Sequence, residues 1–227
     1  MTASLNPIDM IDITAMYSIG RDDYADGQGF EFGLLDNDND NVTVMLGITP
    51  SDRVNFGASY GRDHYVANQV SRNANPAPDP SWTDPARNWT LNNDEVVNNV
   101  DVFLNLPLLL PKTNVRFNYD YSDSDNGFTF GGPRIGSLAA AAQFVPLPNV
   151  TNTWNRLSAD VQYRFAQRVG LGLGYWYEKL DITDFATVDL PNQPVTPRID
   201  YLGAVTTGYG NRPYKGSTAF LRVLYFF

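Results

Sequence analysis

Residues 157–177 read LSADVQYRFAQRVGLGLGYWY, and this stretch decides the fold class. In 157–165 every second residue is apolar, and the residues between them are polar, charged or small. In 169–177 every second residue is again apolar, and most of the residues between them are glycines. Because side chains alternate between the two faces of a strand, each half predicts one strand with one apolar face. The short link between the halves predicts an antiparallel hairpin.

The same alternation recurs along the chain and predicts eight strands, at residues 9–23, 41–49, 53–66, 96–107, 113–123, 153–166, 168–181 and 217–227. Three connections are short, around Pro50, Pro111 and Gln167. Four are long and cover residues 24–40, 67–95, 124–152 and 182–216. Short turns that alternate strictly with long loops are typical of membrane barrels. We therefore predict an all-β, antiparallel up-and-down transmembrane β-barrel of about eight strands, either one domain over 1–227 or the last eight strands of a larger barrel.

The composition narrows the classes of function. Cysteine is absent, which excludes disulfides, thiol catalysis and covalently attached haem. The net charge of −9 argues against nucleic acid as a partner, because a phosphate backbone requires clustered Lys and Arg. No apolar run is long enough for a membrane-spanning helix, and residues 1–14 lack the pattern of a secretory leader. We expect the numbering to be that of a mature protein or a fragment.

Charged residues within the strands indicate a polar inner face. They alternate with the apolar positions, whereas aromatic residues gather near the strand ends, as an interfacial girdle requires. The residues predicted to form a charged network facing the lumen are Asp101, Arg116, Asp120, Asp160, Arg164, Glu178 and Arg222. In a narrow barrel such charges must pair, because an unpaired buried charge costs several kcal/mol, by rough estimate. In a larger barrel the same residues line a wet wall.

The last residues alternate up to a final aromatic, as in the C-terminal signal of outer-membrane β-barrels. The predicted assembly signal consists of Leu221, Val223, Tyr225 and Phe227. The resemblance implies recognition by the barrel-assembly machinery. The predicted location is the bacterial outer membrane, with outer-membrane lipid in contact with the apolar face.

Three segments resemble the C-terminal part of the MtrB/PioB family of outer-membrane barrels associated with decahaem cytochromes. They are MLGITPSDRVNFGASYGRDHY (45–65), RLSADVQYRFAQRVGLGLGYWYEKLDITDFA (156–186) and RPYKGSTAFLRVLYFF (212–227). Family members are far larger, and several carry a Cys-x-x-Cys feature that this chain lacks. The resemblance implies the sheath of a multihaem cytochrome that carries electrons across the outer membrane. It implies no covalently bound cofactor here, since haem would enter only through the partner cytochrome.

Other motifs predict little chemistry. The single His64 follows Asp63, but neighbouring strand residues face opposite sides, so we predict a rim histidine and no enzyme. The run LLDNDNDN at 34–41 lacks the Gly and Glu of a calcium loop, and we predict a solvated loop that retains weak divalent-ion binding as a possibility. A short helix is predicted over 138–144. The candidate loop contacts for a partner are Trp82, Trp89, Arg198 and Arg212.

Three functions remain open from the sequence. The first is a structural or conduit barrel, porin-like, working with a cytochrome. The second is a small eight-stranded outer-membrane barrel that binds ligands or partners through its long loops. The third is a soluble lipocalin-like carrier, which requires an apolar interior and places residues such as Asp160 in water.

Overall fold

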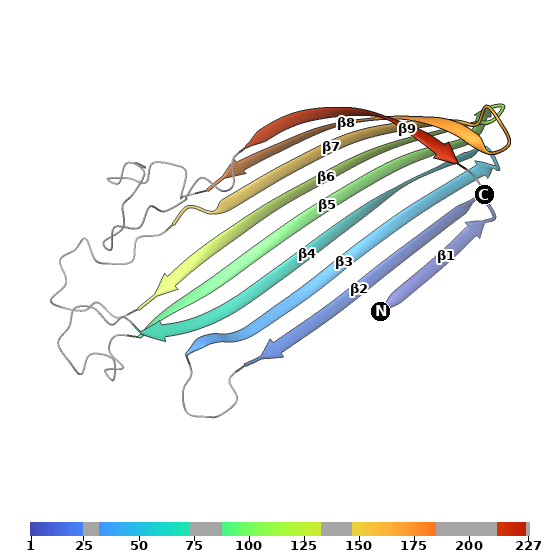
Figure 1. Cartoon of the computed structure of the whole chain (residues 1–227). Coiled ribbons are helices and arrows are strands. Elements are labelled where there is room, and N and C mark those ends of the chain that lie inside the picture. Colours follow the sequence, from blue (N-terminus) through green and yellow to red (C-terminus); the bar gives the residue numbers. More distant parts are fainter. Residues whose placement is uncertain (25–31, 73–87, 133–146, 185–212, 226–227) are drawn as a thin grey trace.

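The protein forms one continuous antiparallel sheet, as a computed structural model shows (Figure 1). The structure describes residues 1–24, 32–72, 88–132, 147–184 and 213–225. Within them lie nine strands: β1 (Thr2–Ile8), β2 (Ile11–Asp23), β3 (Gly33–Ser51), β4 (Val54–Arg72), β5 (Asn88–Leu110), β6 (Thr113–Gly131), β7 (Val150–Tyr163), β8 (Val169–Thr183) and β9 (Tyr214–Tyr225). The strands follow one another in chain order, and each pairs with its neighbours in sequence.

All the short turns lie at one end of the sheet. They span Asp9–Met10, Asp52–Arg53, Pro111–Lys112 and residues 164–168. Lys112 has a φ of 64°, the left-handed conformation that a tight turn imposes on one residue. Close to this turn the register of β5 and β6 shifts between Leu106 and Leu110, where Pro107 has no backbone N–H to donate. We refer to the two ends of the sheet as the turn side and the loop side.

The predicted fold class is confirmed, and the structure adds to the predicted strands. The segment TASLNPI forms an additional strand, β1, and hence a fourth short turn. This segment has no regular alternation and contains Pro7, so its sequence favours no strand. The predicted helix over 138–144 lies outside the described residues. Within the described residues no helix is long and apolar enough to span a membrane.

Strands β3 to β6 are much longer than predicted. Each continues toward the loop side through residues that the sequence assigns to loops, namely 33–40, 67–72, 88–95 and 124–131. The backbone hydrogen bonds of the ladder extend through these segments without interruption apart from one irregularity near Leu34. The sheet is therefore far taller at its centre than a strand of roughly 9–11 residues, the length that crosses a membrane.

The sheet has no apolar core of its own. None of the described hydrophobic residues is buried, and large apolar side chains are exposed along every strand. Leu173 is 57% exposed and Val223 is 74% exposed. A soluble sheet packs its apolar face against a second layer, whereas the wall of a membrane barrel turns that face to lipid. The described part of the chain follows the second pattern.

Candidate functional site

The register between strands divides the side chains into two faces. Residues directly opposite one another lie on the same face. One row across β2–β8 consists of Ile13, Leu46, Ala58, Val102, Tyr119, Leu157 and Tyr177. The adjacent row across β4–β8 consists of Ser59, Asp101, Asp120, Arg156 and Glu178. We term the face of the first row the outer face and that of the second row the inner face.

The outer face changes from apolar to polar partway along the strands. In β4 it presents Phe56, Ala58 and Tyr60 on the turn side, then Arg62 and His64 on the loop side. Tyrosines mark the boundary, as in an interfacial girdle. The hydroxyl of Tyr60 donates to Asn98 Oδ1 at 2.8 Å, one step further toward the loop side. We term the two parts the membrane half and the loop-side half.

Most of the aromatic residues that the sequence places near strand ends lie along this boundary. Tyr119 repeats the arrangement of Tyr60, since its hydroxyl donates to Asn155 Oδ1 at 2.9 Å. Tyr65 differs, because it lies opposite Glu95 on the inner face and does not belong to the boundary. The girdle is thus built by residues whose hydroxyl groups reach from the apolar band toward polar neighbours.

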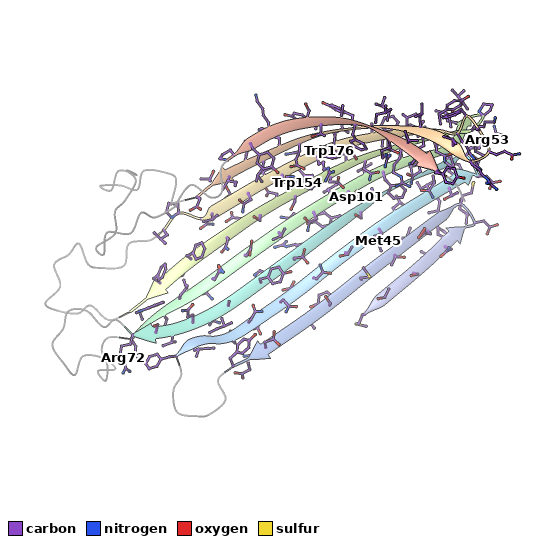
Figure 2. The ribbon with its side chains drawn as sticks, in the orientation of Figure 1. Met45, Arg53, Arg72, Asp101, Trp154 and Trp176 are labelled. Carbon is purple, nitrogen blue, oxygen red and sulfur yellow. The ribbon has the colours of Figure 1, made fainter. Side chains whose placement is uncertain are left out.

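The inner face carries the charges that the sequence assigns to a lumen. One row contains, in order across β5–β8, Asp101, Asp120, Arg156 and Glu178. The guanidinium of Arg156 lies 5.0 Å from the centre of the Trp176 ring. Glu178 accepts a hydrogen bond from the hydroxyl of Tyr214. The sequence-based set omits Arg156, although its even spacing from Asp160 places it on the same face. Figure 2 shows Asp101 on β5, Trp154 on β7 and Trp176 on β8.

Two further rows of the inner face contain glycines of β8. Gly172 and Gly174 are buried on the inner face and lie opposite Arg222 and Phe220 of β9. A Cβ on Gly174 would lie only 2.2 Å from the Phe220 ring. Since β8 presents no side chain here, Arg222 reaches across it and pairs with Asp160 of β7.

The remaining predicted lumen residues make different contacts. Arg116 lies opposite Asp160 in the register, yet its Nε donates to Asn105 Oδ1 at 2.8 Å. Arg164 lies in the turn after β7, where its guanidinium donates to the carbonyl of Gln167. Among the described ion pairs, only Arg222 with Asp160 joins two of the seven predicted residues. Their role in lining a lumen stays a prediction.

The predicted assembly and loop residues fall partly outside the described structure. Leu221, Val223 and Tyr225 lie on the outer face of β9, and all three are more than half exposed. Their role as a signal stays a prediction. Trp89 lies at the start of β5, with its ring centre 6.3 Å from that of Phe130. The other predicted residues, Phe227, Trp82, Arg198 and Arg212, lie outside the described residues.

His64 lies on the outer face of the loop-side half and is held between two carboxylates. Its Nδ1 lies 3.1 Å from Asp40 Oδ1 and its Nε2 lies 3.0 Å from Asp94 Oδ1. Partial burial lowers the pKa of His64, but the hydrogen bonds and negative charges of Asp40 and Asp94 outweigh this effect and raise the pKa above its ordinary value. Asp63 faces the opposite side and accepts hydrogen bonds from Asn41 and Asn99. The two neighbours therefore form no joint acid–base pair.

The Asp-rich run belongs to β3 and is not a loop. Asp36, Asp38 and Asp40 lie on the outer face of this strand, opposite residues of β2 and β4. Asn37, Asn39 and Asn41 alternate with them and lie on the inner face, where Asn41 Nδ2 donates to Asp63 Oδ1. In the part of the chain that the structure describes, no three acidic or histidine side chains converge in a way that could hold a metal ion.

Comparison with known proteins agrees with this arrangement. A family model described as "Putative outer membrane beta-barrel porin, MtrB/PioB" matches residues 1–227. No curated protein matches the chain. Among solved structures, the copper transporter OprC superposes with a TM-score of 0.58 at 14% identity, over 98% of this chain. This chain spans only 32% of the OprC chain, and at such low identity the likeness concerns the fold alone.

Proposed function

Since the chain belongs to the MtrB/PioB family of outer-membrane β-barrel porins, we propose that its nine described strands form part of the wall of a wide, porin-like conduit. The protein resides in the outer membrane. The observation that carries the proposal is the separation of the two faces. The outer face carries an exposed apolar band, and the inner face carries charges, amides and glycines. This is the arrangement expected between lipid and an aqueous lumen.

The number of strands supports a wide wall. In an up-and-down sheet of nine strands, β1 and β9 run in the same direction. A direct pair between them would be parallel, whereas bacterial outer-membrane barrels close with an even number of antiparallel strands. Within the described residues β1 pairs only with β2, and β9 pairs only with β8. Unpaired edges are not tolerated in hydrocarbon, so we propose that further strands, odd in number, complete the wall.

The superposition on a third of a larger β-barrel chain supports the same view. The superposition covers 98% of this chain but only 32% of the larger one. An eight-stranded barrel is just wide enough for side chains to fill, whereas wider barrels leave a channel. The structure gives no support to a soluble lipocalin-like carrier, because the large apolar side chains lie exposed on the outer face and the charges of the membrane half lie on the inner face. We therefore favour a conduit over the small-barrel alternative.

We propose that a multihaem cytochrome, held in the lumen, supplies the haem and that this chain binds none covalently. The chain contains no cysteine for covalent attachment, and its one histidine faces outward between two carboxylates. We further propose that the protein is not an enzyme. Its contribution is a wall that separates the partner from lipid and aligns it across the membrane.

Conductance in a planar bilayer tests the conduit, with a heat-modifiable gel shift as the folding control, and failure of these nine strands to fold without further strands would agree with a wider wall. Protein that folds should give large, steady current steps that favour cations, because acidic side chains such as Asp101 and Glu178 outnumber basic ones on the inner face. The double variant Asp101→Asn/Glu178→Gln should lower this preference. Folded protein that passes no current would instead indicate a filled barrel whose loops carry the function.

Electron transfer into liposomes tests the cytochrome. Vesicles that contain the barrel, a multihaem cytochrome and an internal redox dye should reduce the dye after addition of an external reductant. Vesicles with the barrel alone and with the cytochrome alone serve as controls. Equal dye reduction without the barrel would contradict the sheath role and leave the conduit untouched.

A further inference from the structure

A polar pocket of about 290 Å³ opens on the inner face toward the turn side. Four neighbouring strands, β4 to β7, supply its polar lining, which consists of Asn55, Asn105, Asn114, Arg116, Asp160 and Gln162. The pocket lies in the membrane half, since Arg116 and Asn114 flank the outward Val115 on the same strand. Side chains from separate strands thus converge on one point of the inner face.

The single carboxylate of this pocket is already satisfied. Asp160 Oδ2 accepts from the guanidinium of Arg222, and its Oδ1 accepts from Gln162 Nε2 at 3.0 Å. Arg222 reaches Asp160 only because glycines occupy the intervening strand. A Cβ on Gly172 would lie 3.2 Å from Arg222 Nε, so the guanidinium would have to shift by a few tenths of an ångström. The glycines of β8 therefore determine which arginine Asp160 binds.

Arg116 is consequently not paired with Asp160, and its charge is available to bind a ligand. It lies directly opposite Asp160, but within the described residues it forms no ion pair, and its one hydrogen bond joins Nε to Asn105 Oδ1. Both terminal nitrogens of the guanidinium remain available as donors. Asn114 adds an amide, because its Oδ1 accepts from the backbone of Leu108 at 3.1 Å and its Nδ2 is left to donate. The pocket therefore offers one positive charge and several N–H donors for which the described side chains around it provide no acceptor.

We propose that this pocket is an oxyanion site, which binds the carboxylate or phosphate group of a small solute in the lumen. The fork of a guanidinium matches such groups with two parallel hydrogen bonds. The site deepens the proposed function, because it rests on the inner face being open to an aqueous lumen. Acidic side chains outnumber basic ones on the inner face, so the positive charge of Arg116 gives anions a favoured position along it.

Calorimetric titration of the full chain in nanodiscs tests the site, with inorganic phosphate, succinate and acetyl-glutamate-amide as separate ligands at constant ionic strength. Saturable binding is expected. Arg116→Gln should weaken it about tenfold or more, the loss expected for a charge-assisted hydrogen bond. Asp160→Asn should strengthen binding, since it removes the carboxylate and frees Arg222. A purely structural role for Asp160 predicts the opposite sign.

Arg53→Gln is the matched control, because it removes a positive charge from a turn at the same end of the sheet (Figure 2) and should leave binding unchanged. If Arg116→Gln fails to give the folded gel shift, Asn114→Asp places a carboxylate beside Arg116 and should abolish binding. The proposal is overturned if the parent binds none of the ligands, or if Arg116→Gln and Asn114→Asp both bind like the parent.

The ligands also separate the possible sources of the anion. Preference for phosphate or succinate points to a free solute, whereas preference for acetyl-glutamate-amide points to an acidic side chain of a lumen occupant. Binding is measured without current, so its failure is distinct from the failure of the conduit. Protein that conducts but binds no anion would overturn the site alone.

Discussion

The two halves of strands β3 to β6 differ in what surrounds them, and their sequences differ accordingly. In the membrane half the outer face is apolar, as in Phe56 and Tyr60, while the inner face is polar or glycine. In the loop-side half both faces are polar, with Arg62 and His64 outside and Asp63 inside. The backbone ladder is the same in both. The backbone hydrogen bonds therefore define the strands in both halves, whereas the lipid or water around each half determines which kinds of side chain it carries.

This difference identifies where the sheet depends on lipid. The membrane half has no buried hydrophobic residue among those described and depends on lipid to cover its apolar face. The loop-side half depends on hydrogen bonds between strands, such as the bond from Asn92 Nδ2 to Asn68 Oδ1 at 3.0 Å. The two halves should thus respond differently to the same substitution.

The largest contrast is expected from one charge placed at two heights of β5. Val102→Arg lies in the apolar band and should cost about 2–4 kcal/mol, whereas Val96→Arg lies beside Asp125 and His64 and should cost about 0–1 kcal/mol. Urea titration in lipid vesicles, followed by the gel shift, measures both. Equal losses would show that the boundary at the tyrosines is misplaced.

Replacing each of two inner-face glycines by alanine compares a crowded position with an open one. Gly174→Ala forces the Phe220 ring to move and should cost about 1–3 kcal/mol of the free energy of unfolding. Gly216→Ala, near the loop-side end of β9, meets nothing within 4 Å and should be neutral or slightly stabilising. The same titration serves for both. A harmless Gly174→Ala would mean that the inner face has room for side chains on β8.

A smaller effect concerns pH in the loop-side half alone. The folded-state pKa of His64 is raised, so protonated His64 stabilises the fold through Asp40 and Asp94. This stabilisation is complete below the ordinary pKa near 6.5 and is lost as pH rises through the folded-state pKa. Hydrogen exchange of β4 and β5, corrected for intrinsic rates, should become faster on the loop side over that rise. His64→Gln should remove the trend. Acceleration in the membrane half as well would contradict a local clamp.

The smallest effect is expected from an exposed ion pair on the loop side. Arg21 Nε lies 3.4 Å from Asp38 Oδ1, and both side chains are largely open to solvent. Arg21→Gln should change stability by about 0–1 kcal/mol, because water and salt screen such pairs. Urea titrations at low and high salt should nearly coincide. A loss that persists at high salt would indicate a role beyond this pair.

The comparison also explains what the sequence could predict. Alternation marks a strand only where its two faces meet different media, as in residues 157–165. In the loop-side half both faces meet water, so 36–41 reads as a polar run although it lies in β3. The alternation of side chains along each strand was enough to place Asp101 and Arg222 on the face opposite the apolar residues. The choice of partner was not predictable, because the pair of Arg222 with Asp160 depends on a glycine strand between them.

The length of β5 has a consequence for the cell surface. At about 3.3 Å per residue, its 23 residues measure about 75 Å from end to end. With the usual tilt of about 40°, this corresponds to a height of about 58 Å, of which the apolar band occupies about 25 Å. The central strands therefore extend well beyond the headgroups on the loop side, which is the side where outer-membrane barrels place their extracellular loops. A molecule that approaches from the loop side therefore meets the ends of these strands before it meets lipid.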